Sequence, residues 1–157
     1  MYMRCISLKQ VPSAEYVDSR LRKAVKEMRR HYAFWVPYSG FYESLCISHE
    51  RIELIFYIDM RQNIEECIKE CIKSRKKIHR RCVEEYGEEA CWQYDEEVEK
   101  ELCRNHCEQH YIDKADMASY EILKSLDVMR EYGIKYTERI SYPSPHETLI
   151  RVDIRLR

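Results

Sequence analysis

Eight cysteines, six of them in mirror order around one glycine, constrain this chain of 157 residues more than any other feature. Residues 62–132 contain no proline, and Gly87 is their only glycine. A helical hairpin that turns at this glycine places residues at similar distances from it side by side. The cysteines that then face each other are Cys67 and Cys107, Cys71 and Cys103, and Cys82 and Cys91. The spacing therefore predicts three disulfides in a hairpin over residues 62–110.

The remaining cysteines, Cys5 and Cys46, lie in segments that alternate like strands, and we expect them to form a fourth disulfide. A zinc site is the alternative for the hairpin, because four thiolates suit tetrahedral zinc. Its ligands would be Cys67, Cys71, Cys103 and Cys107, with His106 and His110 as substitutes. Structural zinc sites usually space their cysteines as CxxC rather than CxxxC, and zinc leaves two hairpin cysteines without a role. We therefore favour disulfides over zinc and over free thiols, and assign no metal ligand.

Hydrophobic periodicity predicts where strands and helices follow one another along the chain. Apolar residues recur at three- and four-residue steps from Pro12 to about His31, which indicates an amphipathic helix. The hairpin helices follow residue 62, and the second has no helix breaker between Glu88 and Gly133, so it is either one helix or two joined near His110. Alternating polar and apolar residues predict strands over 2–9, 32–37, 41–48, 51–59, 134–142 and 147–156.

These elements define an α+β protein with a mostly antiparallel sheet and helices on one face. Without the hairpin, the order approximates β-α-β-β-α-β with an extra strand, which is a ferredoxin-like order. The length fits a single domain, 1–157, from which residues 62–110 project as a helical-hairpin insertion stapled by disulfides.

Charged residues make up 35% of the chain, glycine is scarce, and thirteen residues are tyrosine. This composition is typical of proteins from very hot environments, in which intracellular proteins are often rich in disulfides. It resembles that of the small proteins encoded by viruses of hyperthermophilic archaea. The resemblance implies a cytoplasmic protein of such a virus or its host. No apolar run reaches the roughly 18 residues that a membrane-spanning helix needs, so we expect no membrane partner.

Nucleic acid is the ligand that the strand sequences favour. If helices cover one face of the sheet, the other face carries alternate residues that can contact phosphates or stack on a base. The candidates are Tyr57, Lys135, Arg139, Arg151 and Arg155. The alternative is that these arginines pair with acidic residues on neighbouring strands of a solvated face.

Two further functions use other residues of the chain. A metal-dependent nuclease would gather Glu53, Asp59 and Asp153 on adjacent strands to hold Mg²⁺, the one cofactor considered. A non-enzymatic interaction or structural protein would present Tyr86, Trp92 and Tyr94 on the rigid hairpin to a protein partner. The sequence contains no glycine-rich phosphate loop, G-x-S-x-G motif or H-E-x-x-H motif.

Overall fold

The computed structural model of the chain describes residues 3–156 and shows an α+β protein. Its contacts divide the chain into two compact units. The first, which we call the sheet unit, combines the residues up to Asp59 with those from Lys114 onward, and the second, the hairpin unit, is Met60–Asp113. The expectation of one domain with an inserted hairpin stays a prediction.

Five antiparallel strands form the sheet in the order β1-β2-β3-β5-β4. Their bounds are β1 Met3–Ser7, β2 Phe41–Ser48, β3 Ile52–Asp59, β4 Lys135–Ser141 and β5 Glu147–Arg155. Cys5 lies directly opposite Cys46 on β1 and β2, and the two form the expected disulfide. The antiparallel sheet is thus confirmed, and β3 lies at its centre.

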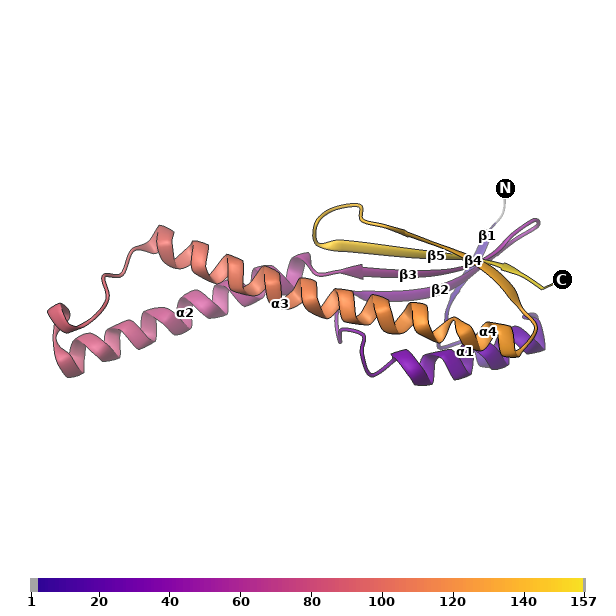
Figure 1. Cartoon of the computed structure of the whole chain (residues 1–157), viewed down its shortest axis with the longest axis horizontal. Helices are drawn as coiled ribbons and strands as arrows, with labels where there is room; N and C mark the ends of the chain where they lie inside the picture. Colours follow the sequence, from indigo (N-terminus) through magenta and orange to yellow (C-terminus); the bar gives the residue numbers. More distant parts are fainter. Residues whose placement is uncertain (1–2, 157) are drawn as a thin grey trace. The chain divides into compact units, whose positions relative to one another are not determined.

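Helices lie on one face of the sheet within this unit (Figure 1). They are α1 Ser19–Tyr32, the part of α3 (Glu96–Ser125) that follows Lys114, and α4 Asp127–Glu131. The core contains Leu54, Phe56 and Ile58 from β3, Ile150 and Val152 from β5, Leu21, Val25 and Met28 from α1, and Ile122 and Met129 from α3 and α4. We call the opposite face the open face, which carries Glu53, Ile55, Tyr57 and Asp59 on β3.

The expected strand over 32–37 is wrong. Tyr32 is the last residue of α1, and residues 33–37 form a turn and loop rather than a strand. The ring of Tyr32 extends the buried stripe of the helix and meets Phe56 edge-to-face, with the ring centroids 5.7 Å apart. The helix also begins later than Pro12, since the Asp18 carboxylate accepts hydrogen bonds from the backbone N–H groups of Arg20 and Leu21 at 2.8 and 3.3 Å.

The ferredoxin-like order is not confirmed. In that order another strand lies between the two strands that the first helix connects, as in a split β-α-β unit. Here β1 pairs directly with β2, and β5 lies between β3 and β4. Sequence periodicity predicts elements, but it does not specify which strands become neighbours.

The hairpin unit consists of α2 (Arg61–Tyr86), a short 3₁₀ helix η2 (Glu88–Ala90) and the first part of α3. Gly87 separates α2 from η2 with a positive φ of 82°, a conformation that favours glycine. The helix α3 begins at Glu96, later than Glu88, because the Asp95 carboxylate caps it by accepting from the N–H of Glu97 at 2.9 Å. It then continues through His110 as one helix.

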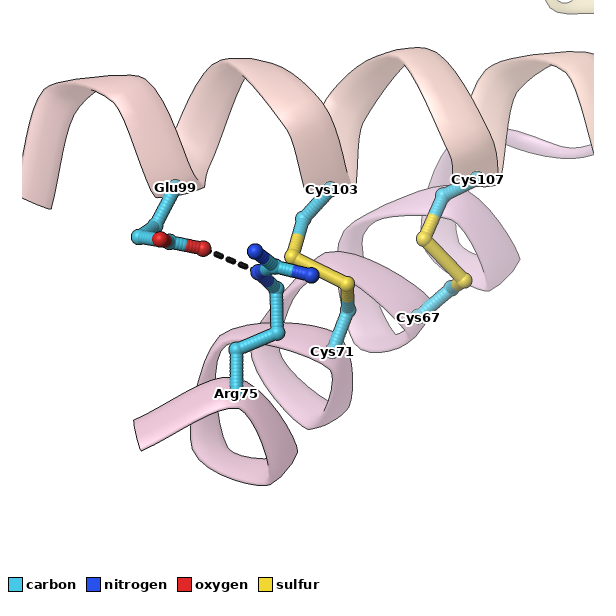
Figure 2. Close-up of a disulfide and its surroundings, with 6 residues drawn as sticks. All are labelled: Cys67, Cys71, Arg75, Glu99, Cys103 and Cys107. Atoms are coloured by element: carbon cyan, nitrogen blue, oxygen red, sulfur yellow. Dashed lines mark hydrogen bonds and ion pairs between the residues drawn. A yellow bond between two sulfur atoms is a disulfide. The ribbon is translucent and has the colours of Figure 1, made fainter. Parts of the chain in front are cut away.

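Three disulfides join the two arms of the hairpin as the mirror spacing predicts, and Figure 2 shows two of them side by side. The Cα–Cα distances are 5.9 Å for Cys67–Cys107, 5.7 Å for Cys71–Cys103 and 6.0 Å for Cys82–Cys91. All eight cysteines are bonded, so the four hairpin cysteines proposed as zinc ligands are not thiolates. The predicted disulfides are therefore confirmed, and the zinc alternative for these cysteines is wrong.

Removing Cys5–Cys46 should destabilise the protein more than removing Cys82–Cys91. The two bridges close loops with sequence separations of 41 and 9 residues, and no other bridge lies within either loop, so chain entropy favours the longer loop by about 1 kcal/mol. Urea unfolding of the Cys5→Ala/Cys46→Ala and Cys82→Ala/Cys91→Ala variants, followed by circular dichroism, measures this difference. Equal losses in the two variants would contradict the expected order.

Candidate nucleic-acid interface

Pairs of cations lie directly opposite each other on β4 and β5. The register of these antiparallel strands places Arg139 opposite Arg151, and Lys135 opposite Arg155. Directly opposed residues share a face of the sheet, and like charges in that position are unfavourable. All four residues are exposed, and their side chains lie on the open face. Four of the five residues expected to bind nucleic acid thus form one strip, which we call the cationic strip.

The acidic residues of the open face are not distributed as one metal site. Glu53 lies opposite Asp153, whereas Asp59 lies opposite Glu147, six residues further along β3. That separation corresponds to about 20 Å of strand, too far for one ion to contact all three proposed ligands. The structure therefore brings Glu53 and Asp153 together but leaves Asp59 apart. Among residues 3–156, no group of three metal-binding side chains is found.

Arginines neutralise the two adjacent carboxylates. Arg151 Nε lies 3.6 Å from Glu53 Oε1, and Arg51 Nε lies 3.7 Å from Asp153 Oδ1. Glu53 is only 3% exposed, so its charge faces Arg151 rather than solvent. Cross-strand pairing thus accounts for part of the open face. Within the described part of the chain, however, no ion pair joins an acid to Lys135, Arg139 or Arg155.

A pair of tyrosines lies on β3, the strand next to the cationic strip, and on β2, one strand further away. Tyr57 lies opposite Tyr42 on β2, and their rings stack with centroids 5.9 Å apart and an angle of 25° between the planes. The Tyr57 hydroxyl donates a hydrogen bond to Glu147 on β5, which orients the ring. The sequence analysis missed Tyr42. The alternation of Tyr42, Ser44 and Cys46 along β2 places all three on one face and could have identified it.

The end of the cationic strip opens into a hollow at the edge of the sheet. This hollow of about 480 Å³ is lined by Arg130, Ile134, Lys135, Tyr136, Thr137 and Arg155. The Arg130 guanidinium lies 5.5 Å from the centroid of the Tyr136 ring, a cation–π arrangement. Three cations around one hollow form a site suited to a phosphate group.

The hairpin unit contains a separate buried polar cluster around Glu99. Its carboxylate accepts hydrogen bonds from Arg75 Nε, as Figure 2 shows, and from Trp92 Nε1 at 2.9 Å. His79 Nε2 lies 2.9 Å from the Trp92 carbonyl oxygen, and its ring meets the rings of Trp92 and Tyr94 at centroid distances of 5.0 and 5.4 Å. The indole that was expected to contact a partner is therefore engaged within the hairpin.

The other residues proposed for interaction or metal binding lie on the surface of the hairpin unit. Tyr86 is well exposed at the end of α2 and Tyr94 is half-buried. His106 and His110 are exposed and lie one turn apart on α3, with their rings stacked at 6.4 Å. They contact each other as surface histidines, and no third metal-binding group from residues 3–156 joins them.

No protein family, curated protein or solved structure gives a significant match to the chain. Among residues 3–156, none of the helices has the length and apolar character needed to cross a membrane.

Stability of the hairpin unit should depend on the charge of Glu99. Its hydrogen bond from Arg75 holds the pKa of the carboxyl below the ordinary value of 4.5; burial acts in the opposite direction, and the Trp92 hydrogen bond helps to lower it. The folded state has the lower pKa, so this contribution is complete above 4.5 and is lost as the pH falls through the folded pKa.

We therefore expect Glu99→Gln to lower the free energy of unfolding at neutral pH by about 2 kcal/mol, the typical value of a charged hydrogen bond. The gap between this variant and the wild type should narrow as the pH falls below 4.5, as urea unfolding at each pH would measure. Glu101→Gln is the control, because Glu101 and its partner Arg104 are exposed on the same helix. A gap that stays constant with pH would contradict this role of Glu99.

Proposed function

We propose that this chain is a nucleic-acid-binding protein that uses the open face of its sheet. The observation that carries the proposal is the register of β4 and β5, which sets Arg139 against Arg151 and Lys135 against Arg155. Opposed like charges cost stability in the free protein, and a polyanion that lies across them relieves the repulsion. The strip therefore has the electrostatic character of a phosphate-binding surface.

The acidic residues of the same face neutralise one cation of the strip, Arg151, and leave the other three. Glu53 pairs with Arg151, Asp153 pairs with Arg51, and Glu147 accepts from Tyr57. The remaining cations of the strip, Lys135, Arg139 and Arg155, have no acidic partner among the described residues. Since the formal net charge of the chain is −1, a local patch rather than a global field would attract the ligand.

The setting that we propose is a virus of hyperthermophilic archaea or its host. The charged, glycine-poor composition supports it, and so do the four disulfides. Disulfides persist in oxidising compartments and in the cells of hyperthermophiles, and the second case fits a protein that meets nucleic acid inside a cell.

Nucleic-acid binding should weaken when the strip loses charge. We expect Arg139→Gln/Arg155→Gln to reduce the slope of log affinity against log salt by roughly 1.4 to 1.8, because each lost phosphate contact removes about 0.7 to 0.9. Fluorescence anisotropy with labelled single-stranded and duplex oligonucleotides, over a series of salt concentrations, measures the slope.

The matched control is Lys23→Gln/Lys26→Gln, which removes the same charge from exposed positions of α1. Its slope should equal that of the wild type, since α1 lies on the other face of the sheet (Figure 1). If both double variants reduce the slope equally, binding is unspecific electrostatics and the proposed interface is wrong. Absence of any salt-dependent binding by the wild type would refute the function itself.

The second candidate is a protein-interaction role for the hairpin unit. Its apolar side chains Ile78, Val98 and Leu102 are each about half exposed, and Val98 and Leu102 lie one turn apart on α3. Exposed apolar residues on a rigid, disulfide-joined scaffold are suited to a protein partner. The nuclease alternative has less support, because Asp59 is separated from Glu53 and Asp153.

A further inference from the structure

A second hollow lies near the edge of the sheet opposite β4, where β2 extends beyond the end of β1. It has a volume of about 700 Å³ and thirteen lining residues, among them Lys9, Arg29, Tyr38, Phe41 and Tyr42. This volume lies within the range of small-molecule sites, and three of these residues present aromatic rings. The cationic strip on β4 and β5 supplies only Arg or Lys side chains from other strands, and none of them lines this hollow.

Two of the aromatic residues that line this hollow expose most of their side-chain surface to solvent. Tyr38 is fully exposed and Tyr42 is 61% exposed, although tyrosine rings are large enough to dominate a core when buried. Phe34, in the same loop between α1 and β2, is 86% exposed. Rings left in solvent beside a hollow are available to stack on a flat ligand.

The hollow is continuous with the open face through Tyr42. This residue lines the hollow and also stacks on Tyr57 at 5.9 Å. Tyr57 lies two residues along β3 from Ile55, and Ile55 lies opposite Arg151. The aromatic pair is therefore only about 7 Å along the sheet from the row that contains Arg139 and Arg151.

The charges around the hollow favour an anionic ligand. Lys9 is exposed, and it is the cation of the lining that stays uncompensated once Arg29 pairs with Glu43. The one acid in the lining, Glu43, is nearly buried and accepts hydrogen bonds from Arg29 at 2.5 Å and from the Tyr32 hydroxyl at 2.7 Å. Burial and the adjacent Glu43 charge raise the pKa of Tyr32, so its hydroxyl stays a proton donor to that carboxylate. Glu43 is thus satisfied within the protein.

We propose that the ligand of the open face is a single-stranded nucleic acid, with one of its bases held in this hollow against Tyr42 and Tyr38. The proposal rests on the function proposed above and adds the class of ligand. Phosphates of the strand lie along the cationic strip, while an unstacked base reaches the tyrosines. A duplex offers the same phosphates, but its bases are paired and stacked, so it contacts the strip alone.

The test compares affinities for oligothymidylate, oligouridylate and a DNA duplex of the same length by fluorescence anisotropy. We expect the wild type to prefer the single strands, and Tyr42→Ala to weaken single-strand binding by roughly 5- to 150-fold, as expected for one lost base–aromatic contact. Duplex affinity should change less than about twofold. The DNA and RNA arms determine which of the two single strands is preferred.

Three further variants make the result specific. Tyr42→Phe keeps the ring and should keep the affinity, while Tyr38→Ala, in an exposed loop, should lower it without affecting the fold. Tyr120→Ala removes a tyrosine of α3 that is as exposed as Tyr42, and it should leave the affinity for single strands unchanged.

Equal weakening of single-strand and duplex binding by Tyr42→Ala would overturn the inference, as would no weakening of either. If Arg139→Gln/Arg155→Gln still reduced the salt slope in that case, the proposed function would stand without the base site. If the wild type bound no oligonucleotide, both would fail together.

Discussion

The register between β3 and β5 is the constraint on which the rest of the sheet unit depends. Leu54 and Phe56 of β3 lie opposite Val152 and Ile150 of β5, and all four are fully buried. Each such side chain contributes about 1.5–3 kcal/mol through burial, and a shift by one residue would turn all of one strand's apolar side chains to the open face. Core packing thereby places Arg151 on the open face.

The hairpin unit is held together by different physics. Of the 26 residues of α2, all within the described part of the chain, only Ile64 is buried. A helix with so little buried apolar surface gains little from the hydrophobic effect. The three disulfides and the Glu99 cluster take the place of a core, in the way that small scaffolds use covalent links. Folding of this unit should therefore depend on the redox state of its cysteines.

Sequence reasoning succeeded where one local periodicity decided the result. The mirror spacing around Gly87 predicted the hairpin disulfides, and alternation predicted strands whose ends match those of β2, β3, β4 and β5 to within one residue. Segments with two competing signals were misread. The aromatic residues after His31 resemble a strand, but Tyr32 belongs to the stripe of α1, and tertiary packing against Phe56 decides the outcome.

The candidate site was only half predictable for a related reason. Single residues such as Arg139 and Arg151 follow from strand alternation, but their opposition depends on which strands become neighbours. The same holds for Glu53 and Asp59, whose separation appears only once the register is known. Tyr42 and its hollow depend on the loop between α1 and β2, for which the sequence predicted a strand.

The most direct measurement of the central claim is a two-dimensional amide NMR titration of the labelled protein with a single-stranded oligonucleotide. The account predicts that the largest shift changes fall on β4, β5 and the 38–42 segment beside the stacked tyrosines. Amides of α1 on the covered face and of the hairpin unit should change little. Shift changes concentrated in residues 60–113, or none at saturating oligonucleotide, would contradict the account.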